Sequence, residues 1–366
     1  MKLKKLKITN FRTYSDLDIN FSDCYNIIYG NNGEGKTNLV ESIYFLAITK
    51  SFRANKDDLM IKKNTDNLIV EGTVKTRFST KYKILLNASK KEVFIDNSKC
   101  SSLSDYISNV NVILFHPDDV FLIKDSPNER RKLINIEISK IYNEYLVILN
   151  KYNKVLKMRN SYIKSYKNGN NFSKEYLDIL TNNLIENGIK ICNYRSEFID
   201  EINKYLSDCY KKIFGYGNLE VKYISVFKNK NSADLIEFYN QNYEKEILNG
   251  KTNYGIHHDD IIFYLDGNKL KDWGSVGQHK NSILSFKLAE IEMLKKQKKE
   301  SPILILDDLF SELDNEKIDN ILKLINKDLQ IFITTTDINK FKFEKIDDFK
   351  VFKIEKEKIM EENYGK

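Results

Sequence analysis

The chain has 366 residues, of which 59 are Lys or Arg and 52 are Asp or Glu, so its formal net charge is +7. At about 100–200 residues per domain, this length predicts two domains, or one with a large insertion. A hydrophobic content of 41% excludes a wholly disordered chain. No stretch approaches the roughly 18–20 apolar residues of a membrane helix, and the basic N-terminus lacks the apolar run of a signal peptide. We therefore expect a cytoplasmic protein with no membrane partner.

The N-terminal region reads as strands, a glycine-containing loop and a helix. Alternating β-branched residues predict strands over Leu3–Thr9 and Leu17–Phe21, and the apolar run Tyr25–Tyr29 stops at Gly30. Residues Leu39–Ala47 then carry helical apolar spacing. Further strand-like stretches follow at 68–78, 82–87, 93–95 and 110–115.

The middle of the chain is helical and the end returns to strands. From residue 128 to about 214 two helical segments of roughly 40 residues are predicted, separated by 168–171, with Gly188 as a candidate interruption of the second. A strand over 219–227 and a helix over 233–248 close this region. After them we predict a strand at 261–265, a helix at 278–299, and fully buried strands at 303–306 and 331–333, as in a parallel sheet covered on both faces.

The loop after the third predicted strand has a phosphate-binding pattern. Its residues, Gly30-Asn31-Asn32-Gly33-Glu34-Gly35-Lys36-Thr37, match G-x-x-x-x-G-K-[ST] at every defined position. Glycines let backbone N–H groups point at phosphate oxygens, and the following helix directs its positive dipole end at the same anion. We expect ATP here, with Lys36 reaching the β- and γ-phosphates and Thr37 binding Mg²⁺ through its hydroxyl.

Two carboxylates follow the buried strand 303–306. We assign Asp307 to Mg²⁺, through water, and Asp308 to polarising the attacking water; a merely solvated strand end is the alternative. Lys36 and Asp307 lie 271 residues apart. The nucleotide-binding head must therefore be assembled from both chain ends, with the helical region inserted between them.

A second candidate anion site lies immediately before the helix that starts near residue 278. Small residues at the start of a helix leave its backbone N–H groups accessible to an anion. The residues concerned are Ser275, Gly277 and Gln278. Two phosphate sites in one chain suggest a nucleotide shared between two protomers. A plain serine-capped helix is the alternative interpretation.

The order of these motifs resembles the ABC-type ATPase heads of the SMC-like group, and within it the RecF family. The more specific matches are Asn10-Phe11-Arg12, Lys50-Ser51-Phe52-Arg53, Pro117-Asp118-Asp119, Ile123-Lys124-Asp125-Ser126-Pro127 with Arg130-Arg131, Tyr254-Gly255-Ile256-His257-His258-Asp259-Asp260, and Ser311-Glu312-Leu313-Asp314. The resemblance implies an α/β fold: an ABC-type P-loop ATPase head built from both chain ends (1–126 and 254–366), with an inserted, mainly helical arm domain (127–253).

The resemblance also implies roles. Ser275, Gly277 and Gln278 would contact the γ-phosphate bound to the opposite protomer, Asp314 would lie in a loop at the dimer interface, and Arg12 would approach the nucleotide. RecF-like proteins form ATP-dependent homodimers that bind DNA. They act with RecR and RecO to load RecA in recombinational gap repair, replication restart and SOS induction. A weak ATPase would serve as the switch.

Three positions depart from the patterns of the wider group. Asp308 stands where most ABC ATPases have glutamate, and Thr334-Thr335-Thr336 occupies the place of a switch histidine. His258 replaces an arginine that is frequent in the family. No glutamine of a Q-loop can be assigned near residues 110–117.

One stretch could contact DNA. Residues 145–173 contain no acidic residue; their cations are Lys151, Lys154, Lys157, Arg159, Lys164 and Lys167, interleaved with Tyr152, Tyr162 and Tyr166. Lysines can neutralise phosphates and tyrosines can stack on bases. A solvated helix face in a lysine-rich chain is the competing interpretation, as is a helix end for the second cluster at 295–299.

Other ATPase classes fit less well. A transporter nucleotide-binding subunit would carry a short subdomain in place of the long insertion. A cohesin-like SMC protein needs a much longer coiled coil and a C-x-x-C hook, whereas the four cysteines form no such pair. A nuclease-coupled defence ATPase would need a further domain for which no length remains.

Overall fold

The computed structural model describes residues 1–167, 173–309, 315–325, 328–340 and 348–363. The predicted helix connection at 168–171 and the motif Ser311–Asp314 lie outside these residues. The chain divides into two compact units, the first formed by 1–120, 205–218 and 276–366, and the second by 121–204 and 219–275. Among the helices of the described segments, none is both long and apolar enough to cross a membrane.

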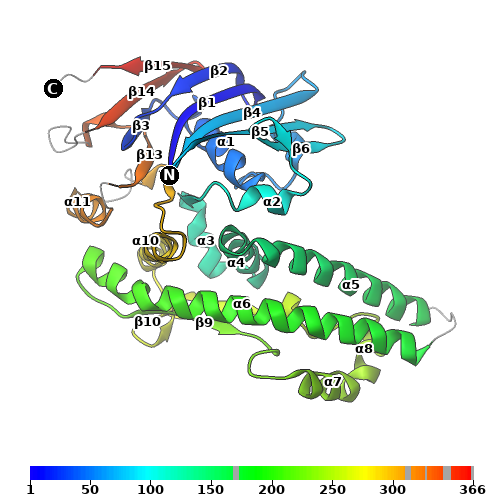
Figure 1. Ribbon diagram of the computed structural model, residues 1–366. Helices are drawn as coiled ribbons and strands as arrows, with labels where there is room; N and C mark the ends of the chain where they lie inside the picture. The colour runs from blue at the N-terminus through cyan, green and yellow to red at the C-terminus, as the bar shows by residue number, and fades with distance from the viewer. Residues whose placement is uncertain (168–172, 310–314, 326–327, 341–347, 364–366) are drawn as a thin grey trace. The chain divides into compact units, whose positions relative to one another are not determined.

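The centre of the first unit is a six-stranded sheet in the order β15-β14-β3-β13-β12-β8. Five of its strands run parallel and β15 pairs antiparallel at one edge. The strands are β3 (Tyr25–Tyr29), β8 (Val112–Phe115), β12 (Ile303–Leu306), β13 (Gln330–Thr335), β14 (Phe349–Glu355) and β15 (Lys358–Glu362). In Figure 1 the blue strand β3 lies between the orange β13 and the red β14. The two ends of the chain thus complete one sheet.

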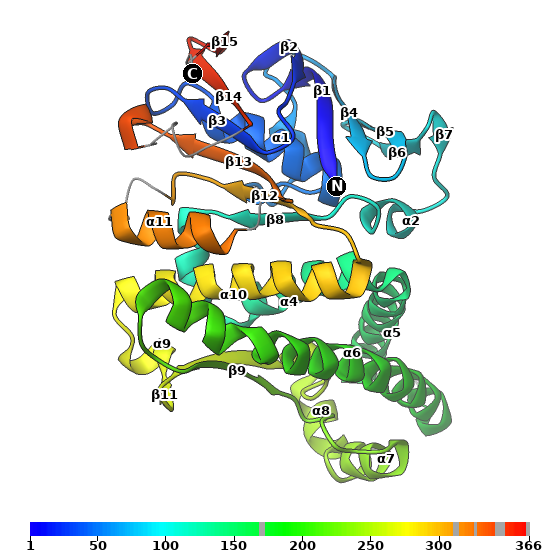
Figure 2. The same cartoon turned by 60° about the vertical axis from the view of Figure 1, so that its left-hand side comes forward.

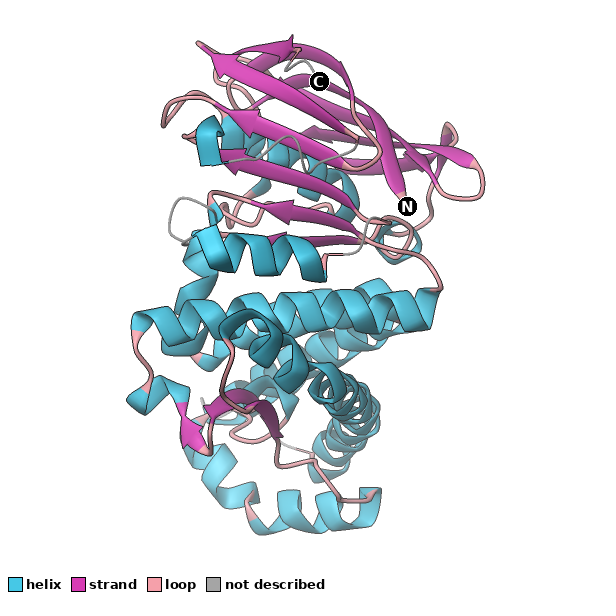
Figure 3. Ribbon diagram, turned by 90° about the vertical axis from the view of Figure 1, so that its left-hand side faces the viewer, coloured by secondary structure: helices cyan, strands magenta, loops and turns pink. Residues whose placement is uncertain are grey.

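A second sheet of the first unit is antiparallel, in the order β2-β1-β4-β5-β6-β7. Its strands are β1 (Lys2–Phe11), β2 (Tyr14–Asn20), β4 (Asn67–Lys75), β5 (Ser79–Asn87), β6 (Lys91–Ile95) and β7 (Ser98–Lys99). Helix α1 (Lys36–Ile48) contacts strands of both sheets. Figure 3 shows helix lying between strands in the part of the molecule where both chain ends are marked. Because both faces of α1 are covered, nearly all its residues are buried and its apolar residues do not form a single stripe.

The remaining elements of the first unit are mostly helical. They are η1 (Asp57–Met60), α2 (Leu103–Ile107), η2 (Pro117–Val120), α10 (Val276–Lys298), α11 (Asn315–Leu324) and η5 (Ile338–Lys340). Helix α10 packs on β8 and η2 and buries most of its middle. Strands β14 and β15 were not predicted from the sequence, because their lysine- and glutamate-rich patterns carry no long apolar run. Helix α11 was not predicted either, although Ile318, Ile321 and Leu322 follow helical spacing.

The second unit combines helices with a small antiparallel sheet, β11-β10-β9. Its elements are α3 (Phe121–Lys124), α4 (Pro127–Ile141), α5 (Asn143–Lys167), the greater part of α6 (Lys174–Phe214), β9 (Leu219–Ile224), α7 (Ser232–Gln241), α8 (Tyr243–Asn249), η3 (Ile256–His258), β10 (Asp260–Leu265), β11 (Asn268–Lys269) and α9 (Leu270–Trp273). The first predicted 40-residue helix is two helices, because Tyr142 leaves the helical conformation. The helix predicted over 233–248 also divides, at Asn242.

Helix α6 continues through Gly188 without interruption, contrary to expectation (Figure 2). A Cβ atom on Gly188 would lie 2.5 Å from Cε1 of Phe227, so the glycine serves close packing rather than a helix break. The second unit extends beyond the predicted arm 127–253, since β10 pairs along its whole length with β9 and brings 254–275 into the same unit.

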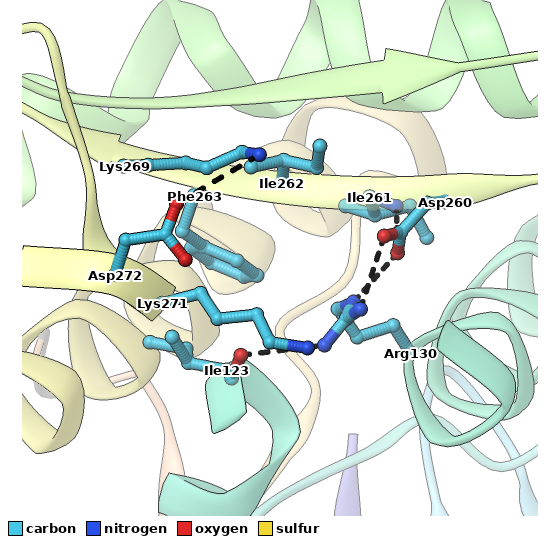
Figure 4. Close-up of a pocket in the computed structure, with 9 residues that line it drawn as sticks. All are labelled: Ile123, Arg130, Asp260, Ile261, Ile262, Phe263, Lys269, Lys271 and Asp272. Atoms are coloured by element: carbon cyan, nitrogen blue, oxygen red, sulfur yellow. Dashed lines mark hydrogen bonds and ion pairs between the residues drawn. The ribbon is translucent and has the colours of Figure 1, made fainter. Parts of the chain in front are cut away.

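Two motifs that are far apart in sequence bind each other in the second unit. Arg130 donates from Nε and Nη2 to the two carboxylate oxygens of Asp260, at 2.7 and 3.0 Å, and from Nη1 to three backbone carbonyls, among them that of Ile123 (Figure 4). Arg131 donates to the backbone oxygen of Asp259 at 2.6 Å. The Arg130–Asp260 pair lines a cavity of about 240 Å³ with Lys269, Lys271 and Asp272. The segments on either side of the insertion are therefore fastened to one another.

A buried ionic network lies in the core of this unit. The fully buried Arg195 donates to Oδ2 of Asp259 at 2.7 Å, to the backbone oxygen of Ile256 at 2.8 Å and to Oδ1 of Asn135 at 3.0 Å. Tyr223 donates its hydroxyl to the same carboxylate oxygen of Asp259. Removal of one partner from this network would leave a buried charge without compensation and should destabilise the unit.

Protonation of His257 should weaken the second unit in mild acid. Burial, the neighbouring His258 and the cations Arg131 and Arg159 lower the pKa of His257 to about 4, against 6.5 for the unperturbed group. Between these values the unfolded chain binds a proton that the folded chain does not, so stability falls as the pH falls. From pH 7 to pH 5 we expect a loss of about 2 kcal/mol from this group. Urea unfolding monitored by circular dichroism measures it. His257→Gln should reduce this pH dependence, and equal slopes in His257→Gln and the parent would contradict the assignment.

Candidate nucleotide-binding site

The parallel sheet gathers the predicted site residues at one edge. Leu306, the last residue of β12, is paired with Phe115 of β8 and with Ile333 of β13, and Tyr29 of β3 is paired with Thr335. The carboxyl ends of these four strands therefore lie together, which is where open α/β sheets bind ligands. Residues that follow different strands become neighbours there.

The loop between β3 and α1 has a backbone that only glycine permits at key positions. Gly35 adopts φ = 110°, and a Cβ on Gly30 would lie 2.4 Å from the backbone oxygen of Ile354. Glu34 accepts from the backbone N–H of Asn31 at 2.8 Å. Asn31, Asn32 and Gly33 are exposed at the loop surface. The loop thus offers exposed backbone at the N-terminus of a 13-residue helix, the arrangement that binds anions.

Lys36 lies at the start of α1 and is buried. Its Nζ donates to the backbone oxygens of Gly30 at 2.7 Å and Asn31 at 2.8 Å, so the loop wraps around the ammonium group. Burial lowers the pKa of Lys36, although Asp308, Asp307 and Glu34 oppose that shift. The three carboxylates favour the charged form and keep a cation beside the loop.

Thr37 and Asp307 meet although 270 positions separate them. The Thr37 hydroxyl donates to Oδ1 of Asp307 at 3.2 Å, and Thr334 donates to the same oxygen at 2.6 Å. Asp307 is 1% exposed. The neighbouring Asp308 has φ = 50°, a left-handed conformation that is unfavourable for a non-glycine residue and is found at functional sites. Its backbone N–H donates to Oγ1 of Thr334 at 2.9 Å.

The oxygen atoms of Thr37 and Asp307 fit Mg²⁺. A hydroxyl and a carboxylate are hard donors, and Mg²⁺ in nucleotide sites is held by one or two carboxylates plus phosphates rather than by an all-protein cage. The described part of the chain has no group of three or more His, Cys, Asp or Glu side chains arranged to hold a metal.

Sequence reasoning missed His116, which follows β8 directly. Its Nδ1 lies 2.9 Å from Oδ2 of Asp307. Burial lowers the pKa of His116, but the hydrogen bond and charge of Asp307, with Asp119 and Asp118, outweigh it and raise the pKa overall. The only signal available was its position at the end of an apolar strand.

Glu41 was also missed, although it stands out as a charge within an apolar helix pattern. It is fully buried and accepts from Arg12 at 2.9 Å (Nε) and 2.7 Å (Nη2), and from Arg53 at 2.6 Å. Burial raises the pKa of Glu41, but hydrogen bonds from Arg12, Ser51 and Arg53 outweigh burial, so the pKa lies below its usual value. Glu41 therefore fixes Arg12 beside α1, about one and a half helical turns from Lys36.

The predicted signature begins helix α10. Gly277 is exposed and Gln278 is half-buried, and Ser275, which belongs to the second unit, is exposed. Gly277, Lys280 and Asp308 line a pocket of about 170 Å³ within the first unit. The second carboxylate and the start of the signature helix thus share one pocket. Asp314 lies outside the described residues.

The candidate DNA-contacting stretch divides into an exposed and a buried part. Lys151, Lys154, Lys157 and Lys164 are exposed on α5. Arg159, by contrast, donates to Thr181, Thr252 and Glu246 at 2.6–3.0 Å and is 2% exposed. Tyr152 is fully buried. The inclusion of Arg159 and Tyr152 among DNA-contacting residues was therefore wrong, because both lie on the inner face of the helix.

Comparison with known proteins agrees with the fold. The family described as the RecF/RecN/SMC N terminal domain matches residues 2–360. An Smc head domain bound to the C-terminal winged-helix domain of ScpA shares the fold, with a TM-score of 0.56 at 15% identity over 100% of this chain and 98% of that one. The chain is therefore an ABC-type ATPase head of the SMC-like group, with an inserted, mainly helical arm, as predicted.

Its relatives within that group are more specific. The DNA replication and repair protein RecF of Ligilactobacillus salivarius is 38% identical over 99% of this chain and 98% of its own length, and that of Pediococcus pentosaceus is 36% identical over 99% of both. A solved structure of the recombination mediator protein RecF with ATP, from the RecFOR pathway, has a TM-score of 0.91 at 28% identity, covering 99% of this chain and 98% of that one. The chain belongs to the RecF family, which confirms the resemblance.

Proposed function

We propose that the protein is an ATP-dependent DNA-binding protein of the cytoplasm. It acts in DNA replication and recombinational gap repair, where binding of ATP and Mg²⁺ closes two heads into a homodimer that holds DNA. With RecR and RecO it supports the loading of RecA, and so takes part in replication restart and SOS induction. Hydrolysis is slow and resets the switch.

The observation that carries this proposal is the convergence of Thr37 and Asp307 beneath the glycine loop, 3.2 Å apart. A phosphate-binding loop alone is common to many enzymes. The contact between Thr37 and Asp307, by contrast, forms only when both chain ends build one sheet. The names of the relatives support a role in replication and repair. The solved RecF structure with ATP supports nucleotide binding by this chain.

Each side chain has a distinct task in the proposed mechanism. Exposed backbone from Asn31 to Gly33 and the start of α1 bind the phosphates, and Lys36 leaves the loop carbonyls to bind the β- and γ-phosphates. Thr37 and Asp307 hold Mg²⁺, which when bound neutralises developing charge on the phosphate oxygens. Asp308 orients the attacking water. Arg12, fixed by Glu41, lies ready to approach the nucleotide.

The dimer provides the experiment that tests the function. Ser275 and Gly277 are exposed and Gln278 is half-buried at the start of α10, so their polar groups can bind a γ-phosphate presented by a second head. ADP lacks that phosphate, and a ligand shifts an equilibrium only by its differential affinity for the two states. Sedimentation velocity should therefore give mostly monomer with ADP and dimer with ATP. Filter binding should show DNA retained with ATP and released with ADP.

Ser275→Arg should leave ATP binding to the monomer intact while it blocks the dimer by bulk and charge, and DNA retention should be lost with it. Ser232→Arg, at the exposed first residue of α7, is a matched control for added charge at the start of a helix. A dimer that persists equally in ADP, or that survives Ser275→Arg, would refute the shared-nucleotide mechanism. Gapped, duplex and single-stranded DNA compared in ATP would then define the preferred substrate.

A further inference from the structure

His116 lies beside the metal-binding edge of the sheet for a reason that can be traced to strand register. Phe115 and Leu306 are paired as the last residues of two parallel strands. The next residue of each strand, His116 and Asp307, therefore extends from the same edge. The imidazole Nδ1 and the carboxylate Oδ2 are 2.9 Å apart, and the two side chains are 15% and 2% exposed.

The imidazole is fixed from its other sides as well. Its ring packs on Phe52, with centroids 4.9 Å apart and planes tilted by 58°, and Phe52 in turn packs edge-on against Tyr44 of α1 at 5.5 Å. The backbone N–H of His116 donates to Asp119 at 3.0 Å. Nε2 faces the exposed carboxylate of Asp118 at 3.4 Å. The ring therefore has little freedom to rotate away from Asp307.

The two oxygens of Asp307 have different partners. Oδ2 faces His116, while Oδ1 accepts from Thr37 and Thr334. Oδ1 is thus the oxygen on the side of Thr37, the other expected ligand of Mg²⁺. A carboxylate that was free to rotate about its χ2 angle would direct one of its equivalent oxygens toward Thr37 only part of the time.

We propose that His116 is a positioning residue: by holding Oδ2 it keeps Oδ1 of Asp307 turned toward Thr37 for metal binding. This inference rests on the proposed binding of ATP and Mg²⁺. It gives a role to the end of β8, the region where no Q-loop glutamine could be assigned. It also gives Phe52, in the loop after α1, the role of supporting the imidazole ring. Groups that orient a metal ligand typically change metal affinity by 10–100-fold when they are removed.

The test measures how ATP binding depends on Mg²⁺, by equilibrium dialysis at a fixed ATP concentration. His116→Phe and His116→Leu both remove the hydrogen bond, and the first keeps the aromatic packing on Phe52. Both should raise the Mg²⁺ concentration for half-maximal ATP binding by 10–100-fold, with ATP binding in excess EDTA unchanged. His116→Asn, whose side-chain amide nitrogen takes the position of Nδ1, should restore the parent value to within a few-fold.

Asp118→Asn is the matched control, because it alters only the exposed contact to Nε2 and should leave the Mg²⁺ dependence unchanged. Thermal unfolding of every variant separates a general loss of structure from a loss of metal affinity. A parent protein with Mg²⁺-dependent ATP binding, together with folded His116→Phe or His116→Leu of unchanged Mg²⁺ dependence, would overturn the role of His116 alone. A parent protein whose ATP binding ignores Mg²⁺ would overturn the proposed function and this inference together.

Discussion

Replacement of Lys36 by alanine is expected to weaken ATP binding by at least 100-fold and to abolish ATP-dependent DNA retention. Lys36 is the cation that the loop encloses, 2.7–2.8 Å from its carbonyls, and two or more charge-assisted hydrogen bonds to phosphate would be lost with it, each worth about 1.5–3 kcal/mol. Equilibrium dialysis with labelled ATP measures the affinity directly.

Lys50→Ala is the control for this substitution. Lys50 is an exposed lysine two residues beyond the end of the same helix, so its removal changes the net charge equally without touching the loop. ATP affinity should be retained in Lys50→Ala. An unchanged ATP affinity in Lys36→Ala would contradict the assignment of the loop as the nucleotide site.

Substitutions at Asp307 and Asp308 are expected to give different losses. Asp307 accepts from Thr37 and Thr334 and faces His116, so Asp307→Asn removes the charge that attracts the metal and should impair Mg²⁺-dependent ATP binding itself. Asp308 is bonded to Thr334 through its backbone N–H. Asp308→Asn should therefore keep ATP binding, reduce hydrolysis by 10²–10⁴-fold, and trap the DNA-bound state.

Two measurements separate the roles. Nucleotide binding with and without Mg²⁺ should distinguish Asp307→Asn from the parent, and phosphate release should distinguish Asp308→Asn. Asp337→Asn, a carboxylate beyond the end of β13 that accepts from the backbone of Asn339, serves as a control. Identical phenotypes in the two variants, both with loss of nucleotide, would mean that the roles of metal ligand and water-orienting group are misassigned.

Local patterns predicted the glycine loop, because a strand, a loop and a helix follow one another within 24 residues, from Tyr25 to Ile48. The union of both chain ends in one sheet was also predictable. Asp307 can hold Mg²⁺ for a nucleotide only beside a phosphate-binding loop with a hydroxyl such as that of Thr37, and the sequence near Asp307 contains no such loop. The ring of His116 could not be placed in this way. Its contact with Asp307 depends on which residues of β8 and β12 are paired, and nothing in either strand specifies that register.

The prediction that Arg159 contacts DNA was wrong for a different reason. Counting charges over residues 145–173 placed it with the exposed lysines, yet Tyr145, Tyr152 and Arg159 recur at seven-residue intervals and all are buried. A seven-residue interval returns to nearly the same helix face, so this spacing already assigned Arg159 to the inner side. The buried partner Glu246, from a segment predicted to be helical, could not be identified, because that contact is set by tertiary packing.

The position of β3 in the sheet determines which parts of the protein can fold first during translation. Its two neighbours, β13 and β14, leave the ribosome about 300 residues after it. The antiparallel sheet from β1 to β7 and the inserted helices consist of segments nearer in sequence, and domains of this kind fold as they emerge. The backbone N–H and C=O groups on both edges of β3 must therefore wait for their partner strands until translation has nearly finished. A nascent or prematurely terminated chain has no complete nucleotide site, so it cannot respond to ATP before the whole polypeptide has been made.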